Sequence, residues 1–208
     1  VSGKNTKLKI EINNDLLYNR EEWKDLSKSI SAYSISPNGE RLLVTARGDI
    51  FSVPSKAGVT YNLSNSCESN EKFGSWSHDG QSIAYVSDKG GEFNIYIKEL
   101  KSGVEKQLTN VKTNILGIEW SPDSKSILWS DKNNNLTITD VKTGSETLVE
   151  KSEISPMNDY NWSPDSKLII FTRPGKTVST IVVYNIADKQ KIQITDEWYS
   201  SGGGNFST

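Results

Sequence analysis

Four segments of this sequence repeat one another without a gap, and this repeat constrains the fold more than any other feature. Each segment opens on an apolar residue and continues with a Ser-Pro-Asp-Gly-like tetrad and a β-rich run. The segments are 35–44, 76–85, 120–129 and 162–171. Their serines at 36, 77, 121 and 163 lie 41, 44 and 42 residues apart, and a fifth copy opens at Phe206. A period near 42 residues is typical of β-propeller blades or of helical HEAT-type repeats.

The local pattern within one period chooses between these two architectures. In the second copy the tetrad favours a type I turn, and Ser82–Ser87 then reads as a strand. A second turn at 88–91 precedes an alternating run at Asn94–Leu100, and Lys101–Gly103 forms a hairpin turn. Four short strands per period, with no helical stripe, predict a propeller blade. The fourth strands are expected to end at Leu63, Leu108, Leu148 and Ile194.

The repeat therefore predicts an all-β fold, a β-propeller with about four complete four-stranded blades and partial blades at both ends. The complete blades are expected at 31–66, 72–110, 114–151 and 158–196. Residues 1–12 are interpreted as the last strand of a preceding blade, 13–30 as a linker with a short helix or irregular structure, and 200–208 as the start of a next blade. Because an open arc would expose two apolar flanks, we expect a piece of a larger propeller or an arc that closes by dimerising.

Composition excludes several classes of function. The 24 Lys and Arg nearly balance the 26 Asp and Glu, which argues against nucleic-acid binding. The longest apolar runs are tetrads such as Ile181–Tyr184, so no membrane span is expected. Cys67 is the single cysteine of the sequence, which excludes an intrachain disulfide and a Cys-based zinc site. His78 is the single histidine, which excludes most His-dependent metal sites and argues against a catalytic triad. We expect no metal, no cofactor and no catalytic residue in this chain.

Two periodic sets of residues each have a structural and a functional interpretation. The tryptophans could form an aromatic ligand platform, but one per blade favours packing between blades. The tetrad carboxylates could suggest calcium, but one carboxylate per turn favours turn capping over a loop of converging oxygen ligands. We therefore predict structural roles for Trp76, Trp120, Trp162, Asp79, Asp123 and Asp165.

One face of a propeller gathers the links between blades and the turns between second and third strands. Side chains on these segments are the candidates for contacting a peptide or a neighbouring domain, and the alternative is that they are ordinary solvated loops. The candidates, chosen by geometry and not by a motif, are Arg47, Lys72, Asn114, Asp159, Arg173 and Tyr199.

The repeat is similar to those of TolB, of prolyl-oligopeptidase propellers and of tricorn-type peptidases, the PD40-like group. It lacks the Gly-His and Trp-Asp dipeptides of WD40 repeats. Residues 35–63, 76–96 and 179–206 resemble the second, seven-bladed propeller of tricorn protease, and the Ala-Arg-Gly-Asp turn with the Val-Pro step in 46–54 is the most specific part. Three residues depart from the pattern: His78 replaces the tetrad Pro, and Ile35 and Phe206 replace the repeat Trp.

This resemblance implies a multidomain serine peptidase, a hydrolase whose propeller gates or guides peptides toward a catalytic domain outside this chain. The expected partners are peptide substrates and the remaining domains of the parent peptidase, with a homo-oligomer also possible. The alternative is a TolB-like or free-standing propeller that acts as a protein-interaction scaffold. The compartment stays open between cytoplasm and periplasm.

Overall fold

The computed structural model describes residues 25–66 and 68–206, which fold into four antiparallel four-stranded sheets. We call these sheets blades 1 to 4. Blade 1 holds β1 (Ile30–Ile35), β2 (Arg41–Ala46), β3 (Asp49–Pro54) and β4 (Tyr61–Asn62). Blade 2 holds β5 (Glu71–Trp76), β6 (Ser82–Ser87), β7 (Asn94–Glu99) and β8 (Glu105–Gln107). Blade 3 holds β9 (Ile115–Trp120), β10 (Ser126–Asp131), β11 (Asn135–Asp140) and β12 (Glu146–Lys151). Blade 4 holds β13 (Tyr160–Trp162), β14 (Leu168–Arg173), β15 (Thr180–Asn185) and β16 (Lys191–Gln193).

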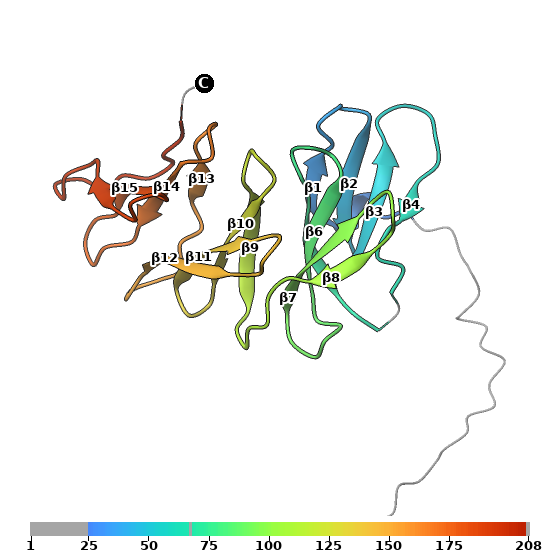
Figure 1. The fold of residues 1–208 in the computed structure, drawn as a ribbon, viewed down its shortest axis with the longest axis horizontal. Helices are drawn as coiled ribbons and strands as arrows, with labels where there is room; N and C mark the ends of the chain where they lie inside the picture. The colour runs from blue at the N-terminus through green and yellow to red at the C-terminus, as the bar shows by residue number, and fades with distance from the viewer. Residues whose placement is uncertain (1–24, 67, 207–208) are drawn as a thin grey trace, which may run out of the picture.

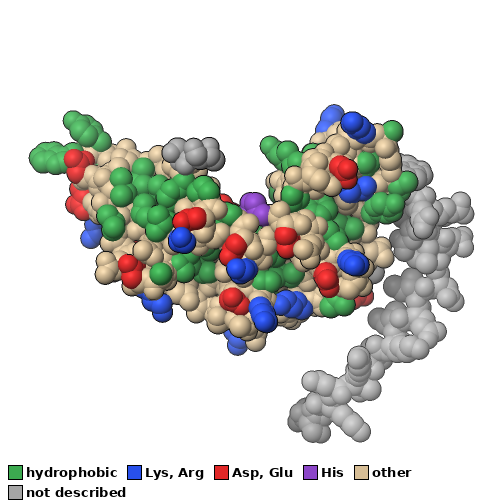
Figure 2. All heavy atoms as spheres, turned by 45° about the horizontal axis from the view of Figure 1, so that its top comes forward, with side chains coloured by type: hydrophobic (Ala, Val, Ile, Leu, Met, Phe, Trp, Pro, Cys, Tyr) green, Lys and Arg blue, Asp and Glu red, His purple; other side chains and the backbone are tan. Residues whose placement is uncertain are grey.

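The four sheets stand side by side in an arc (Figure 1). In each sheet the strands are hydrogen-bonded in sequence order, and the first strands of neighbouring blades contact one another, β1 with β5 and β5 with β9. The first strands are therefore the inner strands, and the fourth strands lie on the outer rim. The space-filling view shows that one side of the arc is concave (Figure 2). The prediction of an all-β, partial β-propeller is confirmed.

The hydrophobic core lies between consecutive blades and not within any one of them. Leu43 and Ile50 of blade 1 pack with Ile83, Tyr85 and Tyr96 of blade 2. Two further buried clusters join blade 2 to blade 3 and blade 3 to blade 4 in the same manner. Because each sheet is covered by its neighbour, the second and third strands are apolar on both faces and read as nearly continuous buried runs, as in β6 and β10.

The strand ends differ from the sequence expectation mainly in blade 3. The backbone N–H groups of Leu63, Leu108 and Ile194 donate to the neighbouring strands at 2.7 to 2.8 Å, so these ladders end at or next to the expected residues. In contrast, β12 continues past Leu148 to Lys151. A register shift accommodates the extra residue, because Leu136 pairs with Glu150 and Thr137 with Leu148.

The predictions made for the two ends of the chain, a strand at the start and the start of a further blade at the end, are not tested by the structure. The strand predicted within residues 1–12 and most of the linker lie outside the described residues. The described end of the linker contains a short 3-10 helix, η2 (Ser27–Ser29). Residues 201–206 form no strand, so the start of a next blade stays a prediction. In the described residues, no helix is long and apolar enough to cross a bilayer.

Candidate functional site

The blades present two opposite faces with different chemistry. The turns between first and second strands carry the repeated tetrads at one end of the sheets, which we call the tetrad face. The opposite end, the link face, carries the segments that lead into the inner strands. Hydrogen bonds tie these segments to the turns between second and third strands: Glu71 N to Gly48 O at 2.8 Å and Lys132 N to Asn114 O at 2.9 Å.

On the tetrad face, each turn is closed by the same small network. In blade 3 the Ser121 hydroxyl donates to Asp123 Oδ1 at 2.7 Å, and the same carboxylate oxygen accepts from Lys125 N at 3.1 Å. The Ser121 hydroxyl in turn accepts from Ser126 N at 3.0 Å. Blades 1, 2 and 4 repeat this network around Asn38, Asp79 and Asp165. In blade 4, hydrogen bonds from Ser163 and Lys167 hold the pKa of Asp165 below its ordinary value.

The last residue of the tetrad connects neighbouring blades. Ser124 and Ser166 stand where blades 1 and 2 have Gly39 and Gly80, and all four have φ between +59° and +70°. The Ser124 hydroxyl accepts from Asp79 N of blade 2 at 3.0 Å, and the Ser166 hydroxyl accepts from Asp123 N of blade 3 at 3.0 Å. The tetrad carboxylates thus act in turns, and in the described residues no group of three or more His, Cys, Asp or Glu side chains could hold a metal ion.

The three repeat tryptophans lie at the ends of the inner strands, and all are buried. The Trp120 indole N–H reaches across to Ser75 O of the preceding blade at 3.3 Å. Within the described chain, the indole nitrogens of Trp76 and Trp162 are buried without a hydrogen-bond partner. Because they are buried, these three tryptophans cannot form an aromatic platform on the surface.

On the inner strands of blades 1, 3 and 4, the residue just before the tryptophan position contacts a segment that follows in the chain. The Ser34 hydroxyl accepts from Trp76 N at 3.2 Å, and Asn161 Nδ2 donates to Gly204 O at 3.3 Å. In blade 3 this position is Glu119, whose carboxylate lies near the backbone N–H of Trp162. Glu119 was not among the residues predicted from the sequence. The sequence did offer a signal, because Glu119 is acidic at a repeat position where the other blades have Ser or Asn.

Glu119 lies in a small polar group between the inner strands of blades 3 and 4. Burial raises the pKa of Glu119 to about 7, against the opposing hydrogen bond from Trp162. Burial also raises the pKa of the nearby Tyr160 phenol to about 12, with a further contribution from the charge of Glu119. The Tyr160 hydroxyl lies 3.5 Å from the Ser130 hydroxyl, and a Cβ at Gly117 would come within 2.8 Å of the phenol oxygen. Gly117 therefore makes room for Tyr160.

The six candidate contact residues come from all four blades, and each has surroundings of its own. Arg47 is exposed in the β2–β3 turn with φ at +54°, and Tyr199 is exposed in the segment after β16. The ammonium of Lys72 lies 3.9 Å from the centroid of the Phe93 ring. Asn114 is half-buried just before the β9 strand, and its backbone oxygen accepts a hydrogen bond from Lys132 N in the β10–β11 turn.

Two candidates are held by hydrogen bonds or ion pairs inside the arc. Asp159 accepts from Thr172 Oγ1 and from Gly203 N, both at 2.5 Å. Arg173 pairs with Glu150 at 2.7 Å, and Lys191 pairs with the same carboxylate at 3.0 Å. Burial opposes ionisation of Glu150, but these two cations keep its pKa below the ordinary value. The link between blades 1 and 2 is anchored similarly by buried Glu71, which accepts from the hydroxyls of Ser66, Ser69 and Ser87 at 2.8, 2.6 and 2.9 Å.

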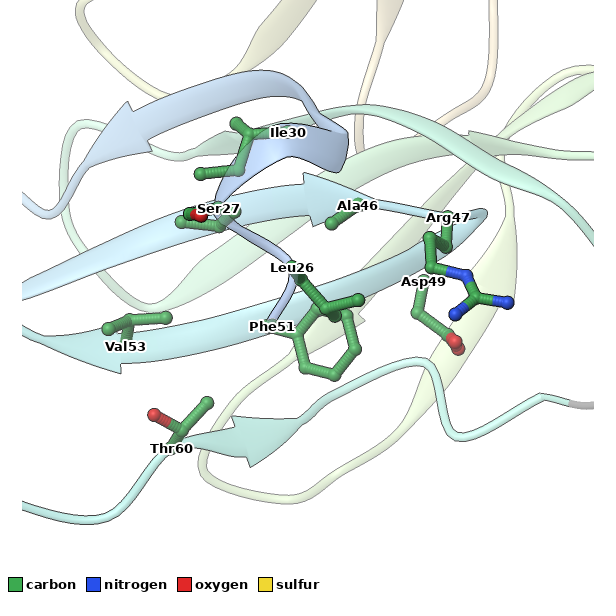
Figure 3. Close-up of a pocket in the computed structure, with 10 residues that line it drawn as sticks. Leu26, Ser27, Ile30, Ala46, Arg47, Asp49, Phe51, Val53 and Thr60 are labelled. Atoms are coloured by element: carbon green, nitrogen blue, oxygen red, sulfur yellow. The ribbon is translucent and has the colours of Figure 1, made fainter. Parts of the chain in front are cut away.

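An open groove lies on the outward flank of blade 1. It has a volume of about 690 Å³ and is lined mainly by apolar side chains, among them Leu26, Ile30 and Phe51, with Arg47 and Asp49 at one end (Figure 3). On the same blade, Tyr33 is 71% exposed and Ile35 is 61% exposed. At the other end of the arc Trp198 is 82% exposed. Exposed apolar surfaces of this kind mark places where a protein surface is normally covered.

Comparison with known proteins assigns the family. The sequence model described as "Tricorn protease second beta propeller domain" matches residues 30–208. This chain belongs to that family. In the tricorn protease of Thermoplasma volcanium, 151 residues align at 22% identity, covering 73% of this chain and 14% of the relative. Dipeptidyl-peptidase 5 of Porphyromonas gingivalis is 34% identical over 122 residues, covering 47% of this chain and 17% of the relative.

Solved structures give the same fold for this tricorn-type propeller chain. The crystal structure of tricorn protease superposes with a TM-score of 0.76 at 17% identity, covering 88% of this chain and 19% of the enzyme. A putative TolB from Agrobacterium tumefaciens superposes with a TM-score of 0.65 at 22% identity, covering 82% of this chain and 63% of that protein. The chain spans half or less of the length of the curated relatives it matches.

Proposed function

We propose that this chain is a non-catalytic propeller segment of a tricorn-like serine peptidase, and that it guides peptide substrates toward a catalytic domain outside this chain. The observation that carries the proposal is the family match over residues 30–208, together with relatives named as a protease and a dipeptidyl-peptidase. The covalent step would then belong to a serine nucleophile elsewhere in the parent protein.

The packing of Gly204 supports a propeller with further blades. A Cβ at Gly204 would lie 2.8 Å from Ile170 Cδ1 and 3.1 Å from Ile181 Cγ2. At Gly74, on the inner strand of blade 2, a Cβ would meet the corresponding residues of blade 1 in the same way, Leu43 at 3.1 Å and Ile50 at 3.0 Å. Gly204 thus approaches blade 4 as Gly74 approaches blade 1, which is where the inner strand of a next blade belongs.

The apolar flanks support the same proposal. Both ends of the arc carry large exposed apolar side chains, and propeller blades bury such faces against their neighbours. A piece of a larger ring therefore fits the structure, and further blades would cover these surfaces.

Kinetics of the longer protein that contains this chain would test the guiding role. Lys72→Glu reverses a charge on the link face, and Lys101→Glu makes the same change at an exposed hairpin turn on the other face. If the link face guides peptides, Lys72→Glu should raise the KM for a long unstructured peptide and leave a short fluorogenic peptide unaffected, and Lys101→Glu should change neither. Equal kinetics for both variants and both substrates would refute the guiding role.

The second candidate function is a TolB-like interaction scaffold with no peptidase attached. This second candidate is supported by the superpositions on two TolB proteins, with TM-scores of 0.65 and 0.66. Sequencing the gene on either side of this segment separates the two candidates, because a serine-peptidase domain in the same reading frame supports the first and an end after the remaining blades supports the second.

A further inference from the structure

The outer strand of blade 3 differs from the outer strands of the other blades. The β12 strand has six residues, whereas β4 has two and β8 and β16 have three each. In the described residues only β11 pairs with β12, so the far edge of β12 is an unpaired strand edge. Such an edge is a template to which another extended chain can add by backbone hydrogen bonds.

The ladder shows which backbone groups of β12 face outward. Asp140 N donates to Ser145 O, and hydrogen-bonded pairs recur at every second residue of an antiparallel ladder. Thr147, which pairs with Ile138, therefore directs its N–H and C=O toward β11. Glu146 and Leu148, on either side of it, direct theirs toward the unpaired edge.

Side chains from β12 also form one wall of a groove on the rim between blades 2 and 3. Two adjoining hollows of about 600 and 500 Å³ share Val111, Lys112 and Glu146, and Leu148 lines the second of them. Leu148 is 55% exposed. Burial raises the pKa of Glu146, and no ion pair involving Glu146 occurs within the described part of the chain.

We propose that β12 binds an extended peptide segment of a partner protein by strand addition, with a basic residue two positions from an apolar one. Residues directly opposite each other in an antiparallel pair have neighbouring side chains on the same face. An added antiparallel strand therefore places its apolar residue beside Leu148 and its basic residue beside Glu146. The matching core sequence is apolar-any-basic, such as Val-Thr-Lys. This rim surface lies apart from the inner strands, so its occupant is additional to any peptide guided along them.

Fluorescence anisotropy with a fluorescein-labelled decapeptide centred on Val-Thr-Lys tests the proposal on the whole chain. Methylation of the Val nitrogen removes a donor that would face β12, whereas methylation of the Thr nitrogen removes one that would face solvent. The first peptide should bind at least about fivefold more weakly than the second, which is the loss expected for one backbone hydrogen bond. Absence of saturable binding of the parent peptide, or equal binding of the two methylated peptides, would overturn strand addition.

Variants of the chain locate the site. Leu148→Pro removes an outward N–H, which an edge strand tolerates, and should weaken binding about fivefold or more. Leu148→Ala keeps that N–H and should weaken binding by only about twofold. Glu146→Gln should lower the affinity about threefold and make it less sensitive to salt. Circular dichroism establishes that each variant is folded; equal affinities of folded Leu148→Pro and wild type would place the peptide elsewhere.

Discussion

The serine hydroxyls that join the tetrad turns of neighbouring blades allow a measurement that separates two opposing energies. Ser124 has φ at +59°, a region where a side chain is strained, yet its hydroxyl accepts from Asp79 N of the preceding blade at 3.0 Å. The hydrogen bond is expected to contribute about 1 kcal/mol to the free energy of unfolding. The left-handed backbone conformation costs about 1 kcal/mol relative to glycine.

Two substitutions at this position therefore have different expected outcomes. Ser124→Ala removes the hydroxyl but keeps the strained Cβ, so the free energy of unfolding should fall by about 1 kcal/mol. Ser124→Gly removes the hydroxyl and relieves the strain, so the two changes should nearly cancel. Urea denaturation followed by tryptophan fluorescence measures both values.

Gly80 supplies the reciprocal test between blades 1 and 2. A Cβ at Gly80 would lie 3.7 Å from Pro37, an ordinary contact, so a serine fits there. Gly80→Ser would add a hydroxyl near Asn38 N at the cost of the strain, and Gly80→Ala would add the strain alone, so the serine variant should be about 1 kcal/mol more stable than the alanine variant. Equal stabilities of Ser and Ala at position 124, or of Ser and Ala at position 80, would refute a stabilising hydrogen bond between blades, whereas equal stabilities of Ala and Gly at position 124 would refute the backbone strain.

Three further predictions concern the inner strands and the rim. Trp120→Phe should destabilise the chain by about 1 kcal/mol more than Trp162→Phe, because only the first loses an indole hydrogen bond, and thermal unfolding compares the two. In the folded state the pKa of Glu119 is about 7, above its ordinary value of 4.5, so the contribution of Glu119 to the free energy of unfolding falls as the pH rises from 4.5 to 7. Glu119→Gln should therefore be more stable than wild type at pH 8 and should lose that advantage near pH 4. Urea titrations at both pH values measure the difference. Arg173→Met removes one of the two cations at Glu150 and should lower the free energy of unfolding by about 1 kcal/mol or less, with a double mutant cycle against Glu150→Gln isolating the pair.

The period of the tetrads and the strand-turn chemistry within one repeat were sufficient to predict the blades. Each tetrad is a local object whose serine and carboxylate bond to backbone groups within five residues, so its structure is encoded in adjacent residues. The burial of Trp76, Trp120 and Trp162, one each in blades 2 to 4, follows from the same periodicity. The individual strand ends were predicted less well, because the extension of β12 beyond Leu148 depends on a register shift against β11 and not on a local turn signal.

The hydrogen bonds between blades join residues that lie 23 to 45 positions apart in the sequence, so they could not be predicted from local patterns. Burial in the assembled arc raises the pKa of Glu119, and the pairing of Glu150 with Arg173 and Lys191 joins three strands from two blades. Local patterns in the sequence are enough to predict a series of four-stranded sheets, because turns and alternation depend on neighbouring residues. The assembled arc decided which polar side chains are held between sheets and which edge, that of β12, stays open to another strand, because burial and pairing depend on the neighbours that folding supplies.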